Sequence, residues 1–136
     1  SLDVHSGEIV GIAGVSGNGQ REMAQAIAGL RPIKSGTVKI NGNDLTNALP
    51  VERFGAGLGY VPEDRLGVGL APRLSVTENA ILRNYKGLRQ GPLLIDDKMS
   101  KHCRDIVEKF GVRTGPLDEP IAGLSGGNLQ RLLVGQ

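Results

Sequence analysis

The stretch GIAGVSGNGQREMAQAIAGL, residues 11–30, decides the fold. It overlaps the run GEIVGIAG, residues 7–14, whose β-branched residues predict a buried strand. After Gly19, apolar residues recur at helical spacing up to Gly29, a typical helix end. A glycine-bearing turn between a strand and a helix presents main-chain N–H groups to an anion at the positive end of the helix dipole. We therefore predict a phosphate-binding loop here.

The predicted loop departs from an active phosphate-binding loop at two positions. An active loop has a lysine that reaches the β- and γ-phosphates and a hydroxyl that holds Mg²⁺. This chain has neutral Gln20 and then Arg21, which offers magnesium no oxygen. We expect phosphate binding without efficient phosphoryl transfer. The residues expected to bind the phosphates of ATP are Gly14, Val15, Ser16, Gly17, Asn18, Gly19, Gln20 and Arg21.

Two other interpretations of the loop fit less well. A dinucleotide-binding fold needs a small third residue, but Gly17, Gly19 and Glu22 give G-x-G-x-x-E. An ordinary strand-to-helix turn does not need three glycines in six residues.

Composition narrows the class of protein. The chain has 136 residues, of which sixteen are basic and fourteen acidic, so its charge does not favour nucleic acid or an anionic membrane surface as a partner. A single cysteine, Cys103, fits a reducing compartment. No apolar run approaches the roughly 20 residues of a membrane span, and the first residues do not resemble a signal peptide. We expect a soluble chain that meets a membrane only through a partner.

Local patterns predict the elements that follow. SGTVKINGNDL, residues 35–45, indicates a short strand with a turn at Asn41-Gly42. Residues 49–54 indicate a short helix, and residues 58–64 a strand that ends at Pro62. Residues 65–74 are expected to form a loop.

The next part of the chain is expected to be mostly helical. Ser75 and Glu78 have the spacing of a capping box ahead of an apolar run. DDKMSKHCRDIVEKF, residues 96–110, is amphipathic, and Gly111 is its expected C-cap. We predict an α/β core over about residues 1–71, a helical subdomain over about 72–125, and the start of another helix over 124–136.

Several charged residues in these elements have ordinary interpretations. Asp96 and Asp97 are expected to complement a helix dipole. Adjacent His102 and Cys103 diverge on one helix, so we expect a surface histidine and a core cysteine, and no metal site. Asp64-Arg65 is either a local ion pair or part of a surface that meets another subunit.

LSGGN, residues 124–128, is a second candidate for anion recognition. Ser125, Gly126 and Gly127 precede an apolar helical pattern and would present a hydroxyl and free amides at a helix start. Alone, this pattern is equally typical of an N-cap serine with flexible glycines. The pattern is much more specific for anion recognition here, because it lies about 105 residues after a predicted phosphate loop with predicted helices between them.

Together these motifs resemble the ATP-binding cassette (ABC) ATPase family over nearly all of residues 7–136. GVSGNGQR occupies the Walker A position, YVPEDR the Q-loop segment and LSGGNLQR the signature motif. The resemblance implies a P-loop NTPase-like α/β fold with three layers and a helical subdomain. The closest likeness is to the second, degenerate cassette of tandem-cassette importers of simple sugars and nucleosides.

The resemblance also implies roles for particular residues. Glu63 stands at the position of the Q-loop glutamine, and this departure leaves the usual magnesium-sensing role unassigned. The signature, which would serve the site of a partner cassette, comprises Leu124, Ser125, Gly126, Gly127, Asn128 and Gln130. The Walker B strand with its catalytic carboxylate lies beyond residue 136 in the family pattern, so we expect a cassette fragment without a catalytic residue of its own.

The resemblance further implies partners and a location. We expect a second cassette, transmembrane permease subunits and, indirectly, a solute-binding protein, with ATP bound and Mg²⁺ held in the competent site of the parent protein. The location would be the cytoplasmic side of the bacterial plasma membrane. Two alternatives stay open at this point: a non-catalytic nucleotide-binding or dimerisation module, and a soluble ABC protein of repair or translation.

Overall fold

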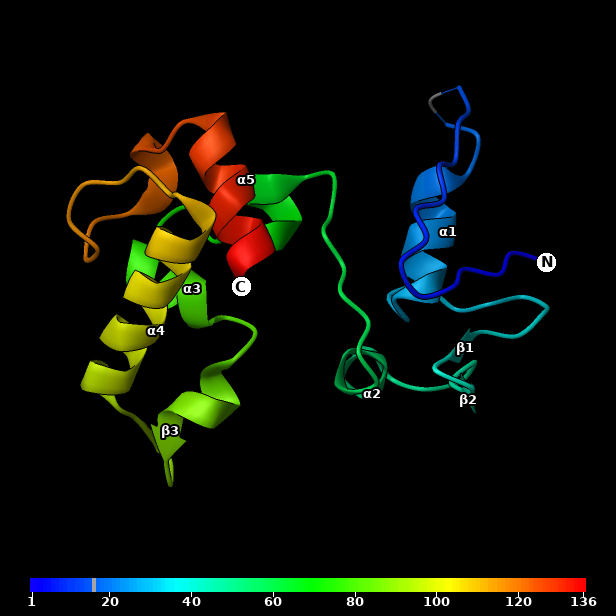
Figure 1. The fold of residues 1–136 in the computed structure, drawn as a ribbon, viewed down its shortest axis with the longest axis horizontal. Coiled ribbons are helices and arrows are strands. Elements are labelled where there is room, and N and C mark those ends of the chain that lie inside the picture. The colour runs from blue at the N-terminus through cyan, green and yellow to red at the C-terminus, as the bar shows by residue number, and fades with distance from the viewer. Residues whose placement is uncertain (16) are drawn as a thin grey trace. The chain divides into compact units, whose positions relative to one another are not determined.

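A computed structural model describes residues 1–15 and 17–136 of the chain. The chain forms two compact units, residues 1–60 and residues 61–136, each of which is described by itself (Figure 1). None of the helices in the described residues is long and apolar enough to cross a membrane.

The first unit contains two helices and a small hairpin. Helix α1 spans Gln20–Ile27, and β1 (Lys39–Ile40) pairs antiparallel with β2 (Asn43–Asp44). Asn41 and Gly42 both have positive φ angles, 50° and 80°, as a tight two-residue hairpin turn requires. Helix α2 spans Pro50–Gly55. The predicted turn and both helices are confirmed.

The prediction of a buried strand over residues 7–14 is wrong for this structure. These residues form no strand, and Ile9 is 98% exposed. Residues 58–64 form no strand either. The physical reason is that a strand needs hydrogen-bonding neighbours and a covered face. Among the described residues the paired strands are only the two short hairpins, so neither segment has a sheet to join.

The second unit is mostly helical. Its elements are the π-helical turn η1 (Arg65–Gly69), α3 (Val76–Ile81), the 3-10 turn η2 (Tyr85–Leu88), β3 (Arg89–Gln90), β4 (Leu93–Leu94), α4 (Asp96–Phe110), the 3-10 turn η3 (Ile121–Gly123) and α5 (Gly126–Gly135). Residues 65–69, expected to be loop, therefore form a helical turn. The expected helices and the Gly111 C-cap, with φ 63°, are confirmed.

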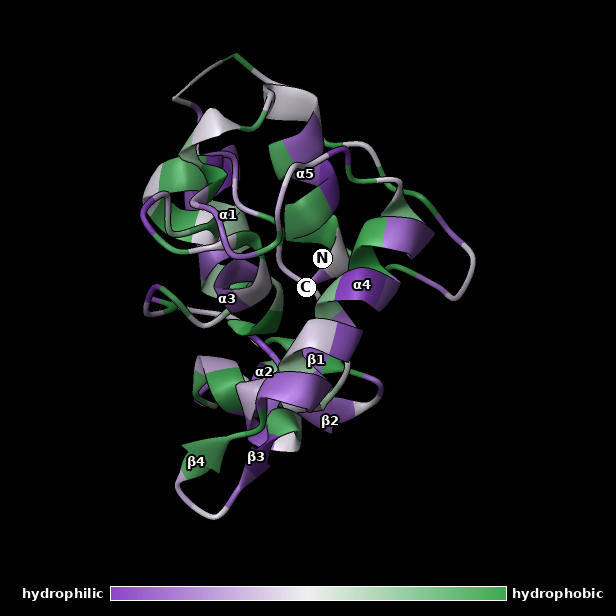
Figure 2. Ribbon diagram, turned by 90° about the vertical axis from the view of Figure 1, so that its left-hand side faces the viewer, coloured by the Kyte–Doolittle hydropathy of each residue, from purple (hydrophilic) through white to green (hydrophobic). Residues whose placement is uncertain are grey.

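The core of the second unit lies where α3, α4 and α5 pack together. Figure 2 shows why: hydrophilic and hydrophobic colours alternate around α4 and α5, so each helix has one apolar side to bury. The hairpin strand β4 is hydrophobic yet lies outside this core, with Leu93 exposed. The buried core residues are Leu70, Val76, Ala80, Cys103, Ile106, Val112, Ile121, Leu129, Leu132 and Leu133.

A long-range main-chain connection holds the start of α3. Residues 117–121, called the strap below, lie against residues 74–77. The amides of Val76 and Thr77 donate to the strap at 3.1 and 3.0 Å, and the amide of Ile121 donates back to Leu74 at 3.1 Å. Since the strap leads through η3 into α5, it connects α3 with the segment 124–128.

The predicted capping box at the start of α3 is present. The Ser75 amide donates to Oε2 of Glu78 at 2.7 Å, and the Glu78 amide donates to Oγ of Ser75 at 3.1 Å. These hydrogen bonds favour the ionised carboxylate and lower the pKa of Glu78. The box therefore fixes both the start of α3 and the charge of Glu78.

Candidate functional site

The glycine-rich loop places two glycines in the conformation that the sequence predicts. Gly17 and Gly19 have φ angles of 91° and 94°, and a Cβ at either position would meet nothing within 4 Å. They are therefore needed for their backbone angles rather than for space. Gly19 is also the N-cap residue of α1 and makes no side-chain cap bond. Among the described residues no side-chain cap is formed at the start of α1, so its first amides would suit an anion.

Gln20 reaches back over the loop. Its Nε2 donates to the main-chain oxygen of Val15 at 3.4 Å. A Cβ at Gly14 would meet this side-chain amide, so the side chain of Gln20 lies directly over Gly14. A neutral amide here fills space beside the loop without contributing positive charge.

The remaining loop residues divide into those that the structure describes and one that it does not. Asn18 closes a turn, because its main-chain N–H donates to the main-chain oxygen of Val15 at 3.1 Å. Arg21 is exposed on the first turn of α1. Ser16 lies outside the described residues.

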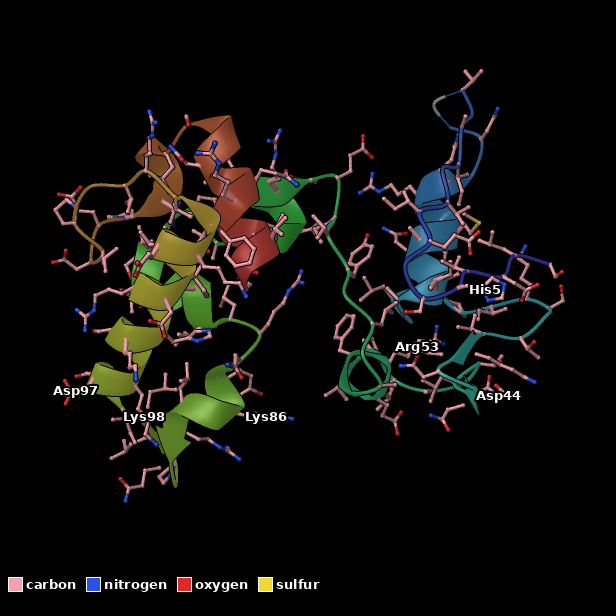
Figure 3. The ribbon with its side chains drawn as sticks, viewed as in Figure 1. His5, Asp44, Arg53, Lys86, Asp97 and Lys98 are labelled. Atoms are coloured by element: carbon pink, nitrogen blue, oxygen red, sulfur yellow. The ribbon has the colours of Figure 1, made fainter. Side chains whose placement is uncertain are left out.

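Arg53, which the sequence did not single out, anchors the far end of α1. Its side chain is directed from α2 toward α1 and the hairpin (Figure 3), and the residue is only 2% exposed. Nη1 donates to the oxygens of Ala26 and Ile27 at 2.6 and 2.8 Å. Nη2 donates to Thr46 at 2.8 Å and Nε to Ala48 at 3.2 Å. A cation at the last carbonyls of a helix complements its dipole.

Residues 124–128, the segment predicted to be the signature, lead into helix α5 without the usual side-chain cap. Ser125 is the N-cap residue, but its side chain makes no cap bond to the amides of the first turn. Oγ of Ser125 instead accepts from Nδ2 of Asn128 at 3.1 Å. Gly126 and Gly127, both exposed, follow as the first two helical residues. The Ser125 hydroxyl is therefore held by the Asn128 side chain of α5 and leaves the first main-chain amides of the helix uncapped.

The other signature residues hold this helix start in place. Leu124 packs against the core, and Asn128 accepts from the Arg113 amide through Oδ1 at 2.9 Å. Gln130 is exposed on α5. Leu129, between them, is buried.

Glu63, predicted to stand at the Q-loop position, lies beside the segment predicted to be the signature. Glu63 is exposed and lines a pocket of about 340 Å³ together with Asp64, Arg65, Leu66, Gly126 and Leu129. Arg65 reaches the signature directly, since Nη1 donates to the oxygen of Gly126 at 3.0 Å. Asp64 instead accepts the amide of Gly67 through Oδ1 at 2.8 Å, so the two residues have separate partners rather than a local ion pair.

Of the histidine–cysteine pair on α4, the cysteine lies in the core as predicted and the histidine is more buried than expected. Cys103 is fully buried, and this burial raises the pKa of its thiol. His102 is half-buried, and its Nε2 is enclosed without a hydrogen-bond partner among the described residues, so the expected surface histidine is wrong. No group of three or more His, Cys, Asp or Glu side chains in the described part of the chain is arranged to hold a metal.

Comparison with known proteins decides the family. The ABC transporter family profile matches residues 1–136. The chain belongs to the ABC transporter family. This membership implies the P-loop NTPase fold. The described residues form only two antiparallel hairpins and helices, so the expected three-layer α/β core is not seen among them.

Several curated relatives of this ABC transporter chain are ATP-binding proteins of importers. A glucose import ATP-binding protein of Haloferax volcanii is 45% identical over 98% of this chain and 25% of its own length. A ribose import ATP-binding protein of Rubrobacter xylanophilus is 42% identical over 100% of this chain and 28% of its own length. A guanosine import ATP-binding protein of Bacillus subtilis is 39% identical over 100% of this chain and 27% of its own length. The chain spans about a quarter of the length of these relatives.

Proposed function

We propose that this chain is part of an ATP-binding protein that couples ATP binding and hydrolysis to the import of a sugar or a nucleoside. The family match and the names of the relatives support this proposal. The parent protein would act at the cytoplasmic face of the membrane with permease subunits and, indirectly, with a solute-binding protein.

The loop 14–21 would form a degenerate nucleotide site. The open space around Gly17 and Gly19 and the uncapped start of α1 fit a chain of phosphates. Such a loop must also hold Mg²⁺ and neutralise developing charge. The neutral Gln20 would not neutralise charge as a lysine does, and Arg21 has no oxygen ligand for Mg²⁺. The loop would therefore bind ATP with little dependence on magnesium and would contribute little to turnover.

The signature would serve the competent site of a second cassette. The observation that carries this proposal is the start of α5, where the Ser125 hydroxyl is not used to cap the helix and two glycines precede Asn128. A hydroxyl, main-chain amides and a helix dipole aimed at a transferred phosphate stabilise the charge that develops there. Ser125 would then matter more to turnover than Gln20.

The test compares Ser125→Arg with Gln20→Ala in the full-length protein assembled with its permease. We expect Ser125→Arg to lower the ATPase rate by about 100-fold or more, the size of effect seen when a phosphate-stabilising donor is lost. Gln20→Ala should leave the rate within about twofold, because a neutral amide stabilises little charge in the transition state. The opposite ranking would remove the assignment of a degenerate loop.

Nucleotide binding at the loop itself needs a separate measurement. A fluorescent ATP analogue is titrated with and without Mg²⁺ into full-length protein carrying Ser125→Arg. We expect similar affinities under both conditions at the site containing Gln20. A strong magnesium requirement at that site would contradict the missing-ligand argument.

A further inference from the structure

We propose that Arg65 is a positioning residue for the start of α5, the helix that carries the signature. The inference rests on the function proposed above and extends it to a residue outside the motif. Its basis is the hydrogen bond from Nη1 of Arg65 to the main-chain oxygen of Gly126, at 3.0 Å across 61 residues of sequence.

The first turn of α5 needs support from outside the helix. Gly126 and Gly127 are its first two residues, and glycine is the poorest helix former after proline. Ser125 does not supply the cap bond that normally compensates for this, because its hydroxyl accepts from Asn128 instead. A first turn built in this way frays unless other residues hold it.

Two contacts from other segments supply that support at different atoms. The Arg113 amide donates to Oδ1 of Asn128 at 2.9 Å and so orients the side chain that bonds Ser125. Arg65 bonds the backbone of Gly126 itself. The first contact fixes the serine hydroxyl, and the second fixes the main-chain path of the two glycines.

Arg65 is itself held against α5. Asp64 caps the turn η1 through the amide of Gly67, and the Leu70 amide closes it on the oxygen of Arg65 at 2.7 Å. At the far end of η1, a Cβ on Gly69 would lie 2.8 Å from Cδ1 of Leu133, so this turn packs closely on α5. The segment that follows Glu63 therefore contacts the signature helix at both ends of η1.

The positive charge of Arg65 allows a positioning role to be distinguished experimentally from a purely stabilising one. A cation at a helix N-terminus opposes the helix dipole, which offsets part of what the Arg65 bond adds to stability. Replacing Arg65 should therefore hardly change the thermal stability of the protein. Removal of the bond should still change the geometry of the glycines, where small displacements are costly for catalysis.

The first experiment measures hydrogen exchange in the full-length protein. Arg65→Ala should speed amide exchange of residues 129–130, the first amides of α5 with a helical acceptor, by about three- to tenfold, the effect of losing one ordinary hydrogen bond. Exchange over residues 131–135 should stay unchanged, and Arg65→Lys, which keeps one donor, should recover part of the protection. Arg104→Ala, which removes the same charge from an exposed position on α4, is the matched control. Equal exchange in Arg65→Ala and Arg104→Ala would overturn the proposal.

The second experiment measures ATPase kinetics of the same variants assembled with the permease. Because the competent nucleotide is held by the other cassette, Arg65→Ala should lower kcat by about tenfold while KM for ATP changes by less than about threefold. Arg65→Lys should restore part of kcat, and the melting temperature should match that of Arg104→Ala. A kcat for Arg65→Ala equal to that of the Arg104→Ala control would refute the role of Arg65.

Ser125→Arg is assayed in parallel to separate the two proposals. If Ser125→Arg abolishes turnover and Arg65→Ala does not alter it, only the role of Arg65 fails. If neither variant affects turnover, the proposed role of the signature fails, and the hydrogen-exchange result still decides whether Arg65 positions α5.

Discussion

Nη1 of Arg53 donates a hydrogen bond of 2.6 Å to the main-chain oxygen of Ala26, which lies 27 residues earlier in the chain. It is the shortest of the hydrogen bonds from Arg53 to the end of α1. Arg53 satisfies four main-chain oxygens at once from a buried position. The charge of a buried arginine is usually neutralised by a carboxylate. Here the negative end of a helix dipole and backbone carbonyls do so.

Arg53→Ala should lower the free energy of unfolding by about 2–4 kcal/mol, because it removes the donor from part-buried carbonyls, among them those of Ile27, Thr46 and Ala48. Arg53→Lys should recover only part of this loss, since an ammonium cannot reproduce the planar fork. Arg31→Ala is the control: Arg31 lies 3.8 Å from Glu22 in a half-exposed ion pair, which contributes at most about 1 kcal/mol. Denaturant titration measures all three, and equal midpoints for Arg53→Ala and Arg31→Ala would contradict the prediction.

Asn79 should be the most sensitive polar residue of the second unit. It is fully buried; Oδ1 accepts from the Ala71 amide at 2.8 Å, and Nδ2 donates to the oxygens of Ala71, Leu74 and Ser75. Asn79→Ala should cost about 2–4 kcal/mol of stability through unsatisfied buried groups.

Asn79→Asp should be worse than Asn79→Ala, because it turns the carboxylate toward three carbonyl oxygens. Asn84→Ala, at an exposed position three residues beyond α3, should cost less than about 0.5 kcal/mol. Thermal unfolding followed by circular dichroism gives the order. If Asp is tolerated better than Ala at residue 79, the assigned side-chain orientation is wrong.

The capping box should make the stability of the protein depend on pH in the acidic range. Hydrogen bonds from Ser75 hold the pKa of Glu78 below its ordinary value of 4.5. A carboxylate whose pKa is lowered by folding contributes stability above its unfolded pKa, and that contribution is lost as pH falls through the folded pKa. The melting temperature of the natural protein should therefore fall relative to that of Glu78→Gln below about pH 4.5. Parallel curves for the two proteins from pH 3 to pH 7 would exclude this linkage.

Gly135 should not tolerate a side chain, although it lies near the end of α5. A Cβ there would stand 2.5 Å from Cγ2 of Ile106 and 3.0 Å from Cδ2 of Phe110. Gly135→Ala should destabilise the α4–α5 packing by about 1–3 kcal/mol through overpacking. Gly123→Ala, where a Cβ meets nothing within 4 Å, should change stability by less than about 0.5 kcal/mol. Calorimetric melting of both variants provides the comparison.

Local chemistry made the helical half of the structure predictable. The capping box of α3, the bounds of α4 and the αL glycine at residue 111 all follow from interactions within one turn of helix. The hairpin at residues 41–42 follows from turn chemistry of the same range.

Predictions that depend on distant partners could not be made from the sequence. The apolar run of residues 7–14 reads as a strand, but whether it is one depends on neighbours that sequence spacing does not reveal. Arg53 was not singled out from the sequence, because its acceptors lie up to 27 residues away. Arg65 was equally hidden, since its partner Gly126 lies 61 residues later. The glycines of both motifs were recognised because their backbone requirements are local.

The strap has a kinetic consequence. Joining residues 117–121 to residues 74–77 closes a loop of about 40 residues, which costs more chain entropy than the contacts between neighbouring helices. The α3–α4 pair should therefore form early in folding and the strap late, so that during unfolding the start of α5 detaches before α4 melts. Pulse-labelling of amides during refolding would show Thr77 and Ile121 acquiring protection after the interior of α4, and simultaneous protection would exclude that order.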